Sequence, residues 1–124
     1  MRPRILIIED HRSIRLLLRD FLASEGYAVL TAPEGATGLA LAQQAAPGLI
    51  LLDLQMPVLD GLAFLRAYRQ LPGPHAAIIV MSAAPVGDAQ LRHLDVDAFV
   101  SKPFDLDDVL TVVRTQLRTR ALVS

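Results

Sequence analysis

Five short apolar runs alternate along the chain with stretches of helical spacing, and this alternation limits the possible folds more than any other feature. The runs are continuous rather than polar-apolar, which is typical of strands covered on both faces of a sheet. Repeated strand-then-helix units favour a parallel sheet with right-handed crossovers. We therefore expect an α/β fold, a doubly wound five-stranded parallel sheet with helices on both faces. Strands are predicted at residues 4–8, 27–32, 49–52, 76–81 and 98–100.

The predicted helices between these strands have recognisable ends. The first covers residues 11–24 and stops before Gly26, because glycine suits a left-handed cap position. Pro33 is predicted to open the second helix, which ends near Ala46. Three more helices are predicted: 61–70 capped by Asp60, 85–94, and Leu106 to about Arg118 capped by Asp105.

The composition excludes several classes of protein. Of the 124 residues 52% are hydrophobic, which is too many for a disordered tail. The longest apolar runs fall far short of the roughly 18 residues that cross a bilayer, and the N-terminus lacks the apolar region of a signal peptide. With no cysteine in the chain, disulfides and thiolate metal sites are excluded. We expect one domain, located in the cytoplasm and without membrane contact.

The charges are nearly balanced, with 12 basic and 13 acidic residues and a net charge of −1. This balance does not predict contact with nucleic acid, which requires a basic excess or stripe. Eleven of the basic residues are arginine, and Lys102 is the single lysine. Because an ammonium and a guanidinium differ in shape and hydration, Lys102 is a candidate for a specific role.

Polar side chains follow four of the five predicted strands. Glu9 and Asp10 come after the first, Asp53 after the third, Ser82 after the fourth and Lys102 after the fifth. Parallel strands present their carboxyl ends at one edge of the sheet, and ligands of such folds bind there. These five side chains are therefore expected to converge.

Their chemistry indicates phosphoryl transfer. Three carboxylates at one edge raise one another's pKa unless a cation compensates them, and Mg²⁺ prefers carboxylate oxygens. A metal ion, the Lys102 ammonium and the Ser82 hydroxyl would surround Asp53. Asp53 would then be the nucleophile that becomes an acyl phosphate.

Each of these residues alone also has a structural interpretation. Glu9-Asp10 would fit a solvated turn with a helix cap, and Asp53 a structural cap at a strand end. Ser82 is a common turn residue, and Lys102-Pro103 would fit a surface turn. Their joint placement at one end of a single sheet favours a functional site.

The chain resembles the receiver domain of two-component response regulators over essentially its whole length. The resemblance rests on Ile7-Ile8-Glu9-Asp10, on residues 51–57 with Asp60-Gly61, on residues 80–83, and on Lys102-Pro103-Phe104. It implies a flavodoxin-like sheet with strand order 2-1-3-4-5. It also implies a receiver domain over residues 1–120, with 121–124 as a C-terminal tail or the start of a linker.

The resemblance implies a phosphorylation-activated signalling switch. Asp53 would accept a phosphoryl group from a histidine kinase or a histidine phosphotransfer protein, and Lys102 would contact that group. Such a domain is not an enzyme on other substrates, since it catalyses only its own phosphorylation and dephosphorylation. The Mg²⁺ ligands that it implies are Glu9, Asp10, Asp53 and the backbone carbonyl of Gln55.

The resemblance also implies which residues carry and time the signal. Ser82 would rotate toward the phosphoryl oxygens, Phe99 would be the switching aromatic, and the peptide bond before Pro103 would be cis. The fourth predicted helix, the fifth strand and the last helix would form the output face and a possible phosphorylation-dependent homodimer. Gln55 and Ala84 occupy the positions that tune phosphoryl lifetime. Because Ala84 offers no polar group to orient water, slow to moderate self-hydrolysis is predicted.

Three other functions compete with this one. A flavodoxin-like nucleotide carrier needs a glycine- and hydroxyl-rich loop where Glu9-Asp10 stands, and a phosphatase of the haloacid dehalogenase type needs an aspartate where Gln55 stands. The remaining alternative is a degenerate receiver that acts as a phosphorylation-independent protein-binding module. The downstream effector or output domain is not encoded in these residues.

Overall fold

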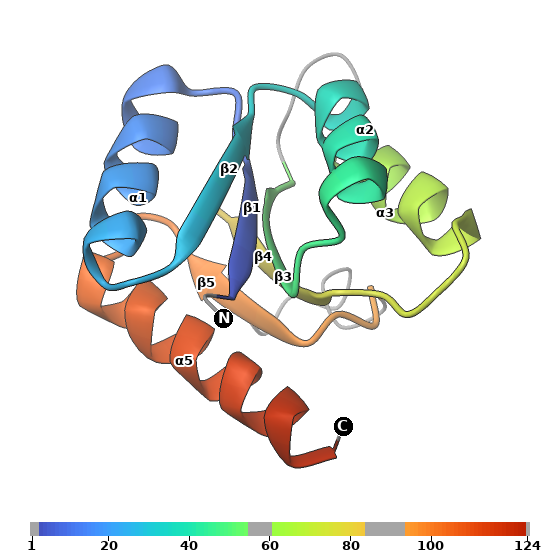
Figure 1. The fold of residues 1–124 in the computed structure, drawn as a ribbon. Helices are drawn as coiled ribbons and strands as arrows, with labels where there is room; N and C mark the ends of the chain where they lie inside the picture. The colour runs from blue at the N-terminus through green and yellow to red at the C-terminus, as the bar shows by residue number, and fades with distance from the viewer. Residues whose placement is uncertain (1–2, 55–60, 84–93, 124) are drawn as a thin grey trace.

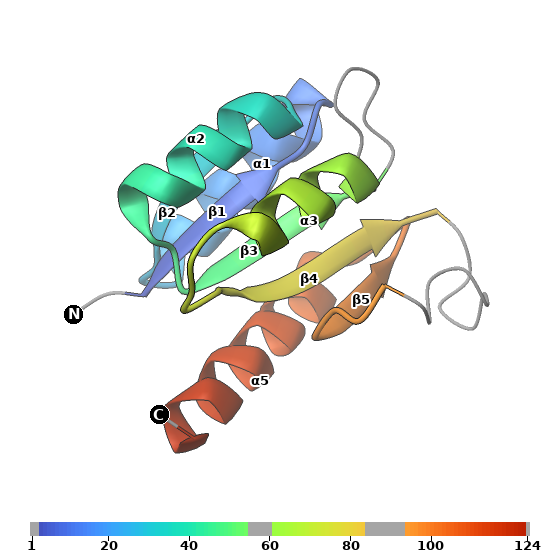
Figure 2. The same ribbon diagram turned by 90° about the vertical axis from the view of Figure 1, so that its right-hand side faces the viewer.

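The computed structural model describes residues 3–54, 61–83 and 94–123. They form one parallel sheet in the order β2-β1-β3-β4-β5 with helices on both faces (Figures 1 and 2). The flavodoxin-like fold and its strand order are therefore confirmed. The strands are β1 (Arg4–Ile8), β2 (Ala28–Ala32), β3 (Leu49–Asp53), β4 (Ala77–Ser82) and β5 (Ala98–Ser101), and the helices are α1 (Arg12–Ser24), α2 (Gly35–Ala45), α3 (Gly61–Gln70) and α5 (Leu106–Val123).

The side chains of the central strands alternate between two hydrophobic clusters. In β1, Ile5 and Ile7 face the cluster formed with α1 and α5, whereas Leu6 and Ile8 face the one formed with α2 and α3. Both sets are fully buried, because helices cover the two faces of the sheet. This double coverage explains why the apolar runs of the sequence are continuous.

Two predicted helix boundaries were wrong. Helix α2 begins at Gly35 rather than Pro33, because Glu34 is still extended (φ −155°, ψ 168°) and serves as the N-cap. Helix α5 continues to Val123 rather than ending near Arg118, since its last residues include good helix formers and no breaker. Asp60 and most of the predicted helix at 85–94 lie outside the described residues. Within the described ranges, no helix is both long and apolar enough to cross a membrane.

Helix α3 begins in direct contact with the main chain that follows β3. A Cβ atom at Gly61 would lie 2.6 Å from Leu54 Cα and 2.8 Å from the Asp53 carbonyl oxygen, so only glycine fits without a backbone shift. The Gly61 N–H also donates to the Leu54 carbonyl at 3.3 Å. Leu54, directly after β3, is therefore held against the first turn of α3.

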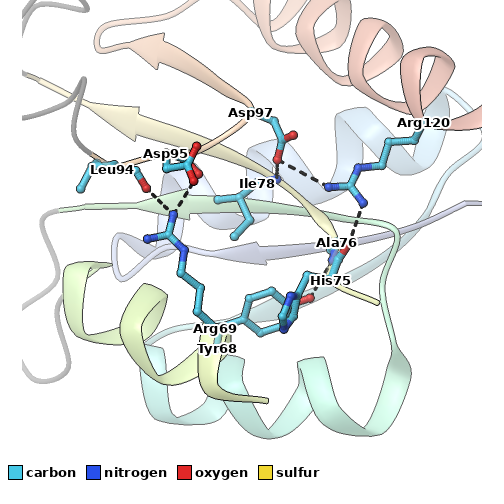
Figure 3. A network of polar contacts seen from close by, with 9 residues as sticks. All are labelled: Tyr68, Arg69, His75, Ala76, Ile78, Leu94, Asp95, Asp97 and Arg120. Carbon is cyan, nitrogen blue, oxygen red and sulfur yellow. Dashed lines mark hydrogen bonds and ion pairs between the residues drawn. The ribbon is translucent and has the colours of Figure 1, made fainter. Parts of the chain in front are cut away.

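At the amino end of the sheet, Asp97 completes the pairing of β4 with β5. Its carboxylate accepts a hydrogen bond from the Ile78 N–H at 2.8 Å, and its own N–H donates to the Ile78 carbonyl at 3.0 Å (Figure 3). Arg120 of α5 lies 3.7 Å from the same carboxylate and donates to the His75 carbonyl at 2.6 Å. These contacts fasten the last turns of α5 to the start of the sheet.

Helix α3 contributes two more contacts to this network. The Tyr68 hydroxyl accepts a hydrogen bond from the Ala76 N–H at 2.8 Å. Arg69 donates to the carbonyls of Leu94 and Asp95, which lie just before β5 (Figure 3). The amino end of the sheet is thus a set of polar groups that satisfy one another.

Candidate metal centre at the carboxyl end of the sheet

The predicted acidic residues lie together at the carboxyl end of the sheet. Glu9 follows β1, Asp53 ends the neighbouring β3, and Asp10 starts the turn into α1. One carboxylate oxygen from each residue lies within 4.8 Å of the others. Glu9 and Asp53 are buried (0% and 1% exposed), whereas Asp10 is exposed. The cluster therefore has two carboxylates inside the protein and one at its surface.

Lys102 is the cation that contacts this cluster. Its Nζ lies 3.1 Å from Asp53 Oδ1 and 3.5 Å from Glu9 Oε1. The peptide bond to Pro103 is cis, as the resemblance implied. One ammonium therefore faces two buried carboxylates, and the cluster keeps excess negative charge when all three of its carboxyl groups are ionised.

The main chain holds Lys102 and Asp53 at a fixed place in the sheet. The Lys102 N–H donates to the Ser82 carbonyl at 2.8 Å, and the Leu54 N–H donates to the Met81 carbonyl at 3.2 Å. Both hydrogen bonds extend the backbone ladder of the sheet past the ends of β5 and β3. The two side chains consequently project from ordered backbone rather than from free loops.

Glu9 shows that the cluster is incompletely compensated. Burial raises its pKa to about 8, a hydrogen bond to Asp53 and the charge of that residue add to the increase, and Lys102 opposes it. Its Oε2 atom is buried and has no hydrogen-bond partner among the described residues. A buried carboxylate oxygen without a donor is costly unless a proton or a cation occupies the site.

The donor set fits Mg²⁺. All three side chains offer carboxylate oxygens, which are the ligands that this hard cation prefers, and the unpartnered Glu9 oxygen belongs to the same group. The exposed Asp10 leaves one side of the cluster open to solvent, as a cation that retains water molecules requires.

The other predicted site residues have different environments. Ser82 ends β4, is 3% exposed and stands in register with Ser101. Phe99 is half-buried and packs against the hydrophobic cluster between the sheet and the helices α2 and α3. Gln55 and Ala84 lie outside the described residues.

Arg15 is a neighbour of the site that the sequence reasoning missed. Its Nη1 donates to the carbonyl oxygens of Glu9 at 2.9 Å and Asp10 at 3.3 Å. The available signal was its position one helical turn after His11, at the start of a helix that follows an acidic pair.

Comparison with known proteins decides the family. The sequence matches the response regulator receiver domain over residues 5–114. The chain belongs to this family. Among its relatives, the response regulator MprA of Mycobacterium sp. (strain KMS) is 36% identical over 120 residues, a match that covers 95% of this chain and 52% of that protein. The receiver domain thus spans about half the length of the curated relatives it matches.

Solved receiver domains share the fold. The CheY-like receiver domain protein of Methanospirillum hungatei is 25% identical with a TM-score of 0.88, and each chain is covered completely. The chemotaxis response regulator CheY4 of Vibrio cholerae is 27% identical with a TM-score of 0.82, covering 93% of this chain and 98% of that one. The receiver fold therefore includes the sheet end at which the acidic cluster lies.

Proposed function

We propose that this receiver domain is a phosphorylation-activated switch of a two-component system and that Asp53 is its phosphoacceptor. The observation that supports the proposal most is the surroundings of Asp53. Its buried carboxylate lies 3.1 Å from the Lys102 ammonium and within 4.8 Å of oxygens from Glu9 and Asp10. A nucleophile next to one fixed cation and a second cation site is suited to a reaction in which negative charge moves between oxygens.

The proposed cofactor is Mg²⁺. Glu9, Asp10, Asp53 and the backbone carbonyl of Gln55 would hold it. When bound, Mg²⁺ neutralises negative charge on phosphoryl oxygens. The raised pKa of Glu9 supports the need for a cation here.

In the proposed reaction, a carboxylate oxygen of Asp53 attacks the phosphorus of a phosphohistidine. The new O–P bond forms as the P–N bond breaks, and the imidazole leaves with the electron pair and takes up a proton. Lys102 stabilises the transferred group with its ammonium, and the Ser82 hydroxyl donates to one of its oxygens. The donor would be a histidine kinase or a histidine phosphotransfer protein.

Phosphorylation would then alter the output surface. The acyl phosphate adds about 1.5 to 2 negative charges and three acceptors, which favours an inward position of Ser82 and of the half-buried Phe99. The segment at 85–94, β5 and α5 would carry the signal to a partner or an attached output domain, or form a homodimer. The phosphoryl group would shift an equilibrium that already exists.

The remaining sequence predictions belong to this proposal. Gln55 and Ala84 would set the lifetime of the phosphoryl group, with slow to moderate self-hydrolysis. The receiver domain would cover residues 1–120 and act in the cytoplasm, without nucleic-acid contact of its own.

The decisive experiment is incubation with acetyl phosphate and Mg²⁺, followed by intact mass spectrometry. We expect one phosphoryl adduct on the wild type, none on Asp53→Asn, and an unchanged adduct on the control Asp20→Asn, because Asp20 lies exposed on α1. A wild type without an adduct would contradict the proposal and favour the phosphorylation-independent binding module.

A further inference from the structure

The main chain that carries Glu9 and Asp10 is held by a side chain from α1. One nitrogen of Arg15, Nη1, donates to the Glu9 carbonyl at 2.9 Å and to the Asp10 carbonyl at 3.3 Å. On the other side, the Glu9 N–H donates to the Ala32 carbonyl at 3.1 Å. The turn that supplies two of the three carboxylates is therefore fixed from both sides.

The arginine ties the first turn of α1 to the main chain that precedes the helix. The N-cap residue of α1, His11, makes no side-chain capping hydrogen bond, and the first turn contains no acidic residue. Strand pairing between β1 and β3 ends at Ile8, so the carbonyls of Glu9 and Asp10 lie beyond the ladder. Arg15 joins the first turn of α1 to the two carbonyls beyond the ladder.

The contacts of Arg15 also leave the carboxylate oxygens of the site unoccupied by the guanidinium. Arg15 donates to main-chain carbonyl oxygens, so these bonds leave the carboxylate oxygens of Glu9 and Asp10 available for a cation. Groups that orient metal ligands commonly change metal affinity by about ten- to a hundredfold when they are removed.

We propose that Arg15 is a positioning residue for the cation site, and that it fixes the Glu9–Asp10 turn so that the carboxylates converge before the metal binds. This inference rests on the proposed function, because it takes the acidic cluster to be a Mg²⁺ site.

The sign of the change in Mg²⁺ affinity distinguishes positioning from simple electrostatics. Removal of a positive charge near three carboxylates would by itself tighten Mg²⁺ binding. Removal of a positioning group weakens it. A purely structural role of Arg15 would lower the thermal midpoint and leave the Mg²⁺ dissociation constant unchanged.

The test is isothermal titration of the metal-free 124-residue chain with Mg²⁺, together with its thermal midpoint. Arg15→Met keeps an unbranched stem and good helix propensity but removes the donor. The matched control is Arg19→Met, since Arg19 lies on the same helix and contacts the exposed Asp20. We expect the dissociation constant of Arg15→Met to rise about tenfold and that of Arg19→Met to stay at the wild-type value.

A second variant keeps the test decisive if Arg15→Met does not fold. Arg15→Lys preserves the charge on a shorter side chain without the guanidinium fork, so it should also weaken Mg²⁺ binding, to a smaller degree. An unchanged or tighter dissociation constant in the folded variants would overturn the positioning role while leaving the proposed function intact. A wild type that binds no Mg²⁺ would instead contradict the proposed function, and the role of Arg15 with it.

Discussion

Charged side chains gather at both ends of the sheet, but their charges are compensated to different degrees. At the amino end, the Asp97 carboxylate has the Ile78 N–H at 2.8 Å and the Arg120 guanidinium at 3.7 Å. At the carboxyl end, Glu9 and Asp53 share the single ammonium of Lys102, and Glu9 Oε2 is left without a partner among the described residues.

The difference is the one expected between a structural polar cluster and a functional one. A cluster that serves stability pairs each donor with an acceptor, because an unmatched buried group costs about 1–3 kcal/mol. A cluster that must receive a cation or a phosphoryl group cannot be compensated in advance. Mutations at the two ends should therefore have opposite effects on stability and function.

The largest expected effect is that of Asp53→Asn at the carboxyl end. Replacing one of two buried carboxylates should abolish the phosphoryl adduct and, without Mg²⁺, stabilise the fold by about 1 kcal/mol. Intact mass spectrometry and urea unfolding measure the two quantities. A variant that loses the adduct and also loses stability would show that the carboxyl end is no less compensated than the amino end.

The next effect is the pH dependence that the Glu9 carboxyl group imposes. Its pKa is about 8 in the folded protein, against an ordinary value of 4.5 that applies to the unfolded chain. Between pH 4.5 and 8 the folded state therefore binds more protons than the unfolded state. This group therefore makes the metal-free protein less stable as pH rises from 4.5 to 8. At the proposed Mg²⁺ site the ion would compete with the proton over the same range, so its affinity should rise by up to about tenfold per pH unit.

Titration calorimetry at pH 6, 7 and 8 measures this dependence, with Glu9→Gln as the control. The amide has no proton to release, so the pH dependence of its Mg²⁺ affinity should be much flatter even though its affinity is lower. An equally steep dependence in Glu9→Gln would assign the proton to another group.

At the amino end, Asp97→Ala should show the reverse pattern. It removes the acceptor of the Ile78 N–H and the partner of Arg120, which should destabilise the fold by about 2 kcal/mol while adduct formation continues. Urea unfolding provides the measurement. The control Asp20→Ala breaks an exposed ion pair with Arg19 and should cost less than about 0.5 kcal/mol. If Asp97→Ala blocked phosphorylation instead, the two ends would not be independent.

The smallest expected effect is that of Lys102→Arg, which keeps the charge of the cluster. The ammonium is a compact donor between two carboxylates, and a planar guanidinium does not fit the same distances. The rate of adduct formation from acetyl phosphate should fall about tenfold, equivalent to about 1.4 kcal/mol in the barrier. A wild-type rate would mean that the site requires only a positive charge.

The features that the sequence predicted are those determined by periodicity and strand ends. Continuous apolar runs such as Leu49 to Leu52 predicted the strands of the sheet. The polar residues directly after the strands predicted that Glu9, Asp10, Asp53 and Lys102 lie together. The start of α2 was misplaced because proline is compatible both with a first helical turn and with the extended residues before it. The end of α5 was misplaced because no residue near Arg118 breaks a helix.

Contacts between side chains and distant main chain could not be predicted in this way. Asp97 caps a strand 19 residues earlier in the chain, and Arg120 reaches a carbonyl 45 residues away. The position of Arg15 at the start of α1 places it near the acidic pair but not against a particular carbonyl, since every residue has a carbonyl group. Such contacts depend on tertiary geometry rather than on residue spacing.

The backbone hydrogen bonds that continue past β3 and β5 should affect how fast nearby amide protons exchange with solvent. The amide protons of Leu54 and Lys102 are engaged with β4 carbonyls, so they should exchange with deuterium only when β3 or β5, respectively, separates from β4. Asp53 should therefore open with the centre of the sheet, and Lys102 with its edge strand β5. If Asp53 is the phosphoacceptor, its carboxylate and the Lys102 ammonium would stay in register between two encounters with a phosphodonor for as long as both strands remain paired with β4.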